Sequence, residues 1–240
     1  MKTIGLLGGM SWESTIQYYR LINEQVKVRL GGLHSAKIVL ASLDFHEIAE
    51  LQRTDNWDDA GRLLTRHARG LQSAGAEIVL ICTNTMHKVA PTVAAGLAIP
   101  LLHVADATAA VVVQSGCRRP GLLGTRFTME ESFYRERLGA ERHLQVLIPD
   151  PDDRAIIHRI IYEELCLGRL LPQSREEFQR IIGKLTAAGA DSVILGCTEI
   201  SLLVGPADAP VPLFDTTAIH SRAAVAWALG EASESLPEKF

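Results

Sequence analysis

The sequence predicts an α/β protein made of two pseudo-symmetric subdomains, each a doubly wound parallel sheet. Short apolar runs typical of buried strands alternate with segments whose apolar residues recur at helical spacing. The chain also repeats itself, because Gly5–Gly8 (GLLG) recurs as Gly121–Gly124 and Ala74–Glu77 (AGAE) recurs as the similar Ala188–Asp191 (AGAD). The two matches stand in the same order at nearly equal offsets, which indicates two related halves of about 115 residues each.

The first half reads as strands and helices in alternation. Ser11 is the expected N-cap of a helix that runs to about Leu30, and Gly75 is expected to end a second helix over Trp57–Ala74. The expected strands are Ile4–Leu7, Ala36–Leu43 and Glu77–Cys82.

The second half follows the same order. Its expected strands are Gly121–Leu123, Gln145–Ile148 and Ser192–Leu195. Helices are expected from about Thr128, over Arg154–Gly168, over Arg175–Gly189 and from about Thr217 to Leu229. The three prolines of Pro206–Pro212 indicate a loop. We place the first subdomain at residues 1–99 plus 207–240 and the second at residues 100–206.

Composition and charge argue against several classes of protein. Of the 240 residues, 47% are hydrophobic and 22% are charged, which is typical of a globular chain. A net charge of −4 with no basic stripe argues against nucleic acid and membrane surfaces as partners. The apolar run Thr3–Met10 is too short for a signal peptide, and no run is long enough to span a membrane. Four cysteines without framework spacing indicate free thiols, so we expect a cytoplasmic protein.

Polar segments follow the predicted strands where a parallel sheet binds ligands, beyond the carboxyl ends. These segments are Gly8–Ser11, Thr83–Thr85, Gly124–Thr125 and Cys197–Glu199. If the halves face each other, the segments converge on an active site in the cleft between the two subdomains. A matched group on each side of such a cleft suits a reaction that treats both faces of one carbon.

Cys197 is the first catalytic candidate because backbone N–H groups and a helix start beyond its strand favour a thiolate. Aligned on the Ala-Gly-Ala repeat, Cys197 matches Thr83, whereas Cys82 matches Gly196. One residue reverses the direction of a side chain in a strand, so Thr83 is expected in the cleft and Cys82 in the core. The alternatives are an inert, packed Cys197 and a Thr83 that only caps a turn.

Neutral donors surround these two positions. Asn84, Thr85 and Thr198 are suited to hold a carboxylate without a cation. His87 either relays protons or is satisfied locally at a helix start. The sequence lacks a dinucleotide glycine pattern, a P-loop lysine, an H-x-x-x-H pair and a C-x-x-C pair, so we expect neither a nucleotide nor a metal.

The chain resembles the aspartate/glutamate racemase family, and within it the enterobacterial L-aspartate/glutamate-specific, broad-specificity members. The segments Gly5–Met10, Thr83–His87, Leu123–Thr125 and Gly196–Ile200 carry this resemblance, in order, over almost the whole chain. It implies two α/β subdomains, a small amino-acid substrate, no cofactor and a homodimer.

The resemblance also implies residue roles. In the family two cysteines flank Cα, and one removes the proton that the other replaces on the opposite face. Here the first cysteine position reads Thr83 and the second is kept as Cys197. A threonine hydroxyl is a far weaker acid than a thiol. We therefore expect the Cys197 thiolate to abstract the proton, and Thr83 or water beside it to deliver one.

Substrate contacts follow from the same resemblance. Those expected to hold the α-carboxylate and α-amino groups are Met10, Asn84, Thr85, Thr125 and Thr198. Gln52 or Arg53 is expected to meet the distal group. Acid-specific relatives carry a basic residue where this chain has Cys166, which leaves room for a neutral polar side chain. Two other functions stay open on the sequence, namely a single-cysteine decarboxylase of the arylmalonate type and a non-catalytic protein that binds small carboxylates.

Overall fold

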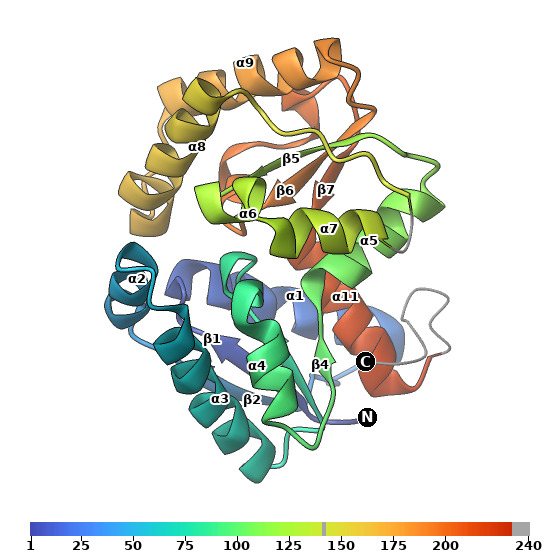
Figure 1. Ribbon diagram of the computed structural model, residues 1–240. Helices are drawn as coiled ribbons and strands as arrows, with labels where there is room; N and C mark the ends of the chain where they lie inside the picture. Colours follow the sequence, from blue (N-terminus) through green and yellow to red (C-terminus); the bar gives the residue numbers. More distant parts are fainter. Residues whose placement is uncertain (141–142, 232–240) are drawn as a thin grey trace. The chain divides into compact units, whose positions relative to one another are not determined.

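The computed structural model describes residues 1–140 and 143–231 (Figure 1). The chain folds into two compact units. The first unit holds Met1–Ala107 and the segment that begins at His220, and the second holds Thr108–Ile219. Both boundaries fall inside helices, α5 (Val104–Gln114) and α11 (Thr216–Leu229). The boundaries expected from the sequence, after residues 99 and 206, lie 8 and 13 residues earlier in the chain than these two.

The first unit contains a four-stranded parallel sheet in the order β2-β1-β3-β4. Its strands are β1 (Ile4–Gly8), β2 (Ile38–Ser42), β3 (Ile78–Ile81) and β4 (Leu101–Leu102). Besides α5 and α11, its helices are α1 (Trp12–Leu30), α2 (Phe45–Arg53), α3 (Trp57–Ser73), η1 (Thr85–Val89) and α4 (Ala90–Ala95). The expected N-cap of α1 is confirmed, because the Ser11 side chain accepts a hydrogen bond from the Ser14 N–H at 3.3 Å.

Two helix layers cover the two faces of this sheet. Leu7 and Val79 point into a core built with α2, α3 and α4. Leu6 and Leu80 point into the opposite core, built with α1 and α11. In Figure 1, α3 and α11 lie on opposite sides of the sheet. This alternation confirms a doubly wound sheet.

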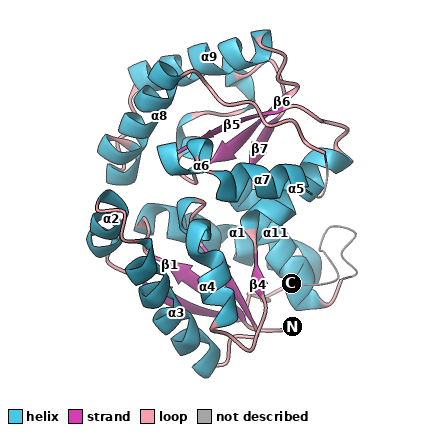
Figure 2. Ribbon diagram, viewed as in Figure 1, coloured by secondary structure: helices cyan, strands magenta, loops and turns pink. Residues whose placement is uncertain are grey.

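The second unit contains a three-stranded parallel sheet in the order β5-β6-β7. Its strands are β5 (Pro120–Gly124), β6 (Ser192–Gly196) and β7 (Leu213–Asp215). Its helices are α6 (Arg126–Glu130), α7 (Ser132–Ala140), α8 (Pro151–Glu163), η2 (Leu165–Leu167), α9 (Pro172–Ala187), α10 (Ile200–Leu203) and η3 (Pro206–Asp208). Figure 2 shows the strands of each unit in magenta with helices alongside them. Because β7 pairs with β6, the residues of β7 lie in this sheet, although the sequence assigns residues 207–240 to the first subdomain.

The two copies of the sequence repeat have the same local structure, one copy in each unit. β1 and β3 pair with Gly5 opposite Val79, and β5 and β6 pair with Gly121 opposite Val193. The helices that precede β3 and β6 both end at a glycine with φ of +95°, Gly75 and Gly189, as left-handed helix ends require.

Two expected elements differ from the structure. The expected strand Gln145–Ile148 makes only one parallel bridge, between Leu147 and Gly121, so it is not a strand of the sheet. The expected helix Arg154–Gly168 ends early, because α8 stops at Glu163 and a short 3₁₀ turn follows. Within residues 1–140 and 143–231, none of the helices has the length and apolar character needed to cross a membrane.

Candidate functional site

In the first unit, the loop after β1 comes close to the loop after β2. Gly9 has φ of +83°, and a Cβ built there would lie 2.2 Å from the backbone N and O of Leu43. The Gly9 N–H donates to Thr15 Oγ1 at 2.8 Å, and the Leu43 N–H donates to the Gly8 carbonyl at 3.0 Å. The glycine pair therefore fixes the backbone of Met10 and Ser11 at this edge of the sheet.

Thr83, Asn84 and Thr85 follow β3 at the same edge. Thr83 is half-buried, whereas Asn84 and Thr85 are 3% and 4% exposed. Cys82, one residue earlier, is fully buried in the core shared with α1 and α11. The prediction that Cys82 faces the core is therefore confirmed, and burial raises the pKa of its thiol well above the ordinary value.

His87 holds the backbone of Thr83. Its Nδ1 lies 2.8 Å from the Thr83 carbonyl oxygen, and its Nε2 accepts from the Val104 N–H at 3.3 Å. Because Nε2 is an acceptor, the proton of the neutral ring is on Nδ1. The locally satisfied reading of His87 is confirmed, since both ring nitrogens bind backbone groups.

Two more buried histidines lie against His87. The ring centroids of His103 and His220 are 4.5 and 5.9 Å from that of His87. His220 Nε2 donates to the Leu102 carbonyl at 3.0 Å and its Nδ1 lies 2.9 Å from the Tyr18 hydroxyl. Burial lowers the pKa of His220 to about 4, so this ring is neutral at pH 7.

Of the remaining candidates in the first unit, Met10 and Gln52 are buried, whereas Arg53 is exposed. Met10 is 3% exposed and its side chain packs in the core with α2 and α3, so its backbone is the part that a ligand could reach. Gln52, at the end of α2, is 5% exposed and its Nε2 donates to Met86 Sδ at 3.1 Å. Arg53 is 70% exposed and pairs with Glu50 at 2.7 Å, so it lies on the surface.

In the second unit, β5 and β6 bring Thr125 and Cys197 to one sheet edge. Gly124 and Gly196 are partners in the parallel register, so the next residue of each strand leaves the sheet beside the other. Thr125 is 5% exposed and caps α6, its Oγ1 accepting from the Thr128 N–H at 3.3 Å. Thr198 is 3% exposed.

A buried carboxylate lies between two thiols at this edge. Cys197 is half-buried, and its Sγ donates to Glu199 Oε2 at 2.9 Å. Cys166 Sγ lies 3.9 Å from Oε1 of the same carboxylate, and Glu199 is 2% exposed. Neither Glu199 nor Cys166 is expected from the sequence to belong to this group. One feature of the sequence points to Glu199: it stands two residues after Cys197, just beyond the end of the same strand.

The expectation that the surroundings of Cys197 favour a thiolate is wrong. Burial raises the pKa of the Cys197 thiol well above its ordinary value, and the charges of Glu199 and Cys166 raise it further. The following helix α10 has only four residues, so its dipole is small. Cys197 is therefore a thiol that is hydrogen-bonded to the Glu199 carboxylate. The two side chains form an acid–base pair, and Cys197 is not a preformed thiolate.

All four cysteines are free, as the sequence predicts. In the part of the chain that the structure describes, no group of three His, Cys, Asp or Glu side chains is arranged to hold a metal ion.

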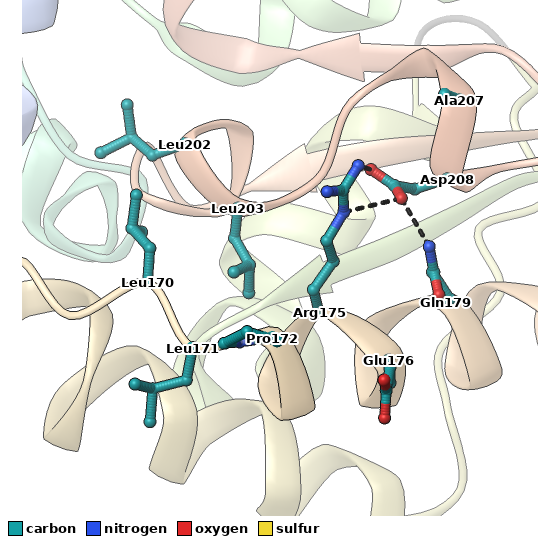
Figure 3. Close-up of a pocket in the computed structure, with 10 residues that line it drawn as sticks. All are labelled: Leu170, Leu171, Pro172, Arg175, Glu176, Gln179, Leu202, Leu203, Ala207 and Asp208. Atoms are coloured by element: carbon teal, nitrogen blue, oxygen red, sulfur yellow. Dashed lines mark hydrogen bonds and ion pairs between the residues drawn. The ribbon is translucent and has the colours of Figure 1, made fainter.

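A separate hollow of about 600 Å³ lies in the second unit (Figure 3). Its lining residues include Leu170, Arg175, Gln179 and Asp208. The Asp208 carboxylate accepts from Arg175 at 2.8 and 2.9 Å and from the Gln179 amide, and the Arg175 guanidinium is the main cause that lowers its pKa to about 2. These polar groups bind one another, and none of the candidate site residues lines the hollow.

Known proteins match this chain over most of its length. A model of the Asp/Glu/hydantoin racemase family matches residues 7–224. A broad-specificity amino-acid racemase of Bacillus subtilis is 20% identical over 228 residues, which cover 92% of this chain and 96% of the relative.

Solved structures are similar over nearly the whole chain. The crystal structure of a candidate Asp/Glu racemase from Yersinia pestis is 57% identical, with a TM-score of 0.88, and covers 95% of this chain and 100% of its own. An aspartate racemase homologue from Pyrococcus horikoshii OT3 is 33% identical, with a TM-score of 0.82 and the same coverage of 95% and 100%.

Proposed function

The chain belongs to the Asp/Glu/hydantoin racemase family, and we propose that it racemises aspartate, glutamate or a related polar amino acid without a cofactor. As a member of this family it is an isomerase that acts on amino acids. The proposal assigns the proton at Cα to Cys197 on one face and to Thr83 on the other.

On the Cys197 side, the acid–base pair with Glu199 supports the assignment. Glu199 accepts the thiol proton as substrate binds, which leaves a thiolate at Cys197. The thiolate then takes the α-proton, and the electron pair of the C–H bond moves into the α-carboxylate to form an enediolate. The α-proton stays on Cys197 as its resting thiol, and Glu199 releases the proton that it accepted to solvent after the product leaves. The 2.9 Å contact between Cys197 Sγ and Glu199 Oε2 is the observation that carries this step.

On the Thr83 side, the hydroxyl replaces the cysteine that the family carries. A hydroxyl donates a proton poorly, because its alkoxide is a strong base. A water molecule beside Thr83 therefore completes the delivery by giving a proton to the hydroxyl as the hydroxyl gives its own to Cα. The carbonyl of Thr83 is fixed by His87 at 2.8 Å, which keeps this residue in place.

The remaining candidates bind the substrate. We assign the α-carboxylate and α-amino groups to the backbone of Met10 and to Asn84, Thr85, Thr125 and Thr198. Gln52 is assigned to the distal group. By its resemblance to the family we expect a cytoplasmic homodimer, which light scattering at several protein concentrations tests.

Deuterium exchange at Cα tests the function. The wild-type chain is incubated in D₂O with each enantiomer of several polar amino acids, and deuterium at Cα and the appearance of the other enantiomer are followed by NMR and chiral chromatography. We expect both signals, and we expect Cys197→Ser to lose them by about 10²-fold or more. An unchanged rate in a folded Cys197→Ser chain contradicts the proposal. Release of CO₂ from an arylmalonate without any exchange favours the decarboxylase instead.

A further inference from the structure

Arg126 lies at the sheet edge that carries Cys197. It follows Thr125 directly beyond the carboxyl end of β5, and Gly124 of β5 is the partner of Gly196 of β6. The pairs Thr125-Arg126 and Cys197-Thr198 therefore leave adjacent parallel strands at the same edge. This position puts a permanent positive charge at the end of the sheet where Cys197 is expected to act.

The neighbours of Arg126 connect it with the Cys197 group. Its backbone N–H donates to His158 Nδ1 at 3.2 Å, and the ring of His158 lies 4.7 Å from the ring of Tyr162, one turn further along α8. The charges of Cys166, Cys197 and Glu199 raise the pKa of the Tyr162 hydroxyl beyond the effect of its burial, and the charge of Arg126 lowers it. The pKa of the Tyr162 hydroxyl thus depends on the charge of the Arg126 guanidinium and on the charges of the thiol–carboxylate group.

The guanidinium of Arg126 is left without an acidic partner. The nearest acid along α6 is Glu130, four residues on, and its Oε1 already binds Arg154 at 2.8 Å. Among the residues that the structure describes, no carboxylate pairs with Arg126, whose side chain is exposed and lies over the Phe127 ring at 5.5 Å. The other arginines of this unit that lie near acids, namely Arg154, Arg159, Arg175 and Arg180, all form ion pairs.

We propose that Arg126 is the specificity-determining residue that binds the side-chain carboxylate of an acidic amino-acid substrate, beside the Cα group handled by Cys197. This inference rests on the proposed function and narrows its substrate class to dicarboxylic amino acids. A guanidinium binds a carboxylate through two parallel hydrogen bonds, which fixes both the charge and the direction of the side chain. Arg126, on α6, would take the place of the basic residue that acid-specific relatives carry where this chain has Cys166.

The neutral amides are the matched substrates for the test, because asparagine and glutamine have the shapes of aspartate and glutamate without the charge. Deuterium exchange at Cα is measured for all four in the wild type and in Arg126→Gln. We expect kcat/KM for the two acids to fall roughly 10- to 100-fold, while the values for the two amides change less than about threefold. Arg126→Lys keeps the charge and is expected to recover part of the loss.

Arg118→Gln is the control, because Arg118 lies beyond the amino end of the same strand, where its guanidinium donates to the Val113 and Cys117 carbonyls. It removes the same charge, and we expect no change in the preference for acids. An equal loss for acids and amides in Arg126→Gln, or no loss for either, overturns the inference while leaving the racemase function in place.

A binding measurement separates this inference from the function itself. Calorimetric titration of Cys197→Ser with L-aspartate and L-asparagine reports affinity when no proton is exchanged. We expect tighter binding of L-aspartate, and loss of that preference when Arg126→Gln is added. If the wild type exchanges no α-proton, the proposed function fails and the titration still decides the role of Arg126. Equal affinities for the two ligands in Cys197→Ser overturn the inference.

Discussion

Cys197 donates a hydrogen bond from its thiol to a carboxylate oxygen of Glu199 over 2.9 Å. The carboxylate is almost fully buried, and it raises the pKa of the thiol in addition to the effect of burial. Glu199 therefore has two opposite effects on Cys197. It disfavours a resting thiolate, and it is the nearest base to take the thiol proton when the thiolate is needed.

Glu199→Gln separates these two effects. The substitution removes the negative charge, so the pKa of the Cys197 thiol falls and a larger share of it is thiolate at pH 8. We expect alkylation of Cys197 by iodoacetamide, read by peptide mass spectrometry, to become several times faster. Deuterium exchange at Cα should nevertheless become about 10²–10³-fold slower, because the base is lost.

Cys166→Ser is the matched control for Glu199→Gln. Cys166 contacts the same carboxylate, but only at 3.9 Å, so its loss should change the exchange rate much less. If Glu199→Gln slows both alkylation and exchange, Glu199 only maintains the local structure, and its role as a base is ruled out.

The repeat is what made the fold predictable from the sequence. Gly75 and Gly189 are recognisable because only glycine adopts the left-handed conformation cheaply at these helix ends, and both strands that follow are buried and apolar. The offset between the repeats also aligns Thr83 with Cys197 in the sequence and predicts that Cys82 lies in the core, and the structure confirms the burial of Cys82.

Local pattern was insufficient where a contact spans a long stretch of chain. Gln145–Ile148 (QVLI) is apolar like a buried strand, yet only Leu147 bridges to β5, because strand formation depends on the neighbouring strand as well as on the segment itself. Cys166 and Glu199 are 33 residues apart, and nothing in the spacing of either shows that they meet. Arg126 reads as a surface residue until the register of β5 and β6 shows that it follows the strand end next to the one that carries Cys197.

Acid should weaken the first unit through His220. Burial lowers the pKa of this ring to about 4 from an ordinary value of 6.5. The unfolded chain therefore binds a proton in a range where the folded chain does not, so the stabilisation is complete above pH 6.5 and is lost as the pH falls toward 4. We expect the free energy of unfolding, measured by urea titration, to fall by on the order of 3 kcal/mol over this range.

Two variants isolate this contribution. His220→Asn removes the titrating group and should flatten the dependence on pH, although it lowers stability at pH 7 because the bonds to Leu102 and Tyr18 change. His34→Asn changes an exposed histidine and should leave the slope as in the wild type. A wild-type slope that persists in His220→Asn contradicts the assignment.

Gly9→Ala should destabilise the chain strongly. Its φ of +83° is unfavourable for alanine, and the added Cβ would lie 2.2 Å from the backbone of Leu43, which has no flexible end to move aside. We expect a loss of about 2–4 kcal/mol in the free energy of unfolding. Gly183→Ala is the control, because no atom lies within 4 Å of its added Cβ on the exposed face of α9, and it should stabilise by about 0.5–1 kcal/mol. Equal effects of the two substitutions would show that the loop after β1 tolerates a side chain.

Thr83→Cys should accelerate racemisation. A thiol gives up a proton near neutral pH far more readily than a hydroxyl, so the acid that reprotonates Cα no longer needs water to complete the step. The two enantiomers of an amino acid have equal free energies in an achiral solvent, so kcat/KM is the same in both directions in any variant. The comparison is therefore made on kcat, which we expect to be unequal in the two directions for the wild type.

In Thr83→Cys, kcat should rise about tenfold or more in the direction that is slower in the wild type, as measured by chiral chromatography from each pure enantiomer. Cys82→Ala removes the adjacent thiol, which is fully buried in the opposite core, and should leave both kcat values unchanged. A Thr83→Cys chain that folds normally and is no faster would show that the hydroxyl does not limit proton delivery. Loss of exchange in a folded Cys82→Ala chain would instead make Cys82 the second acid, and would remove Thr83 from the reaction.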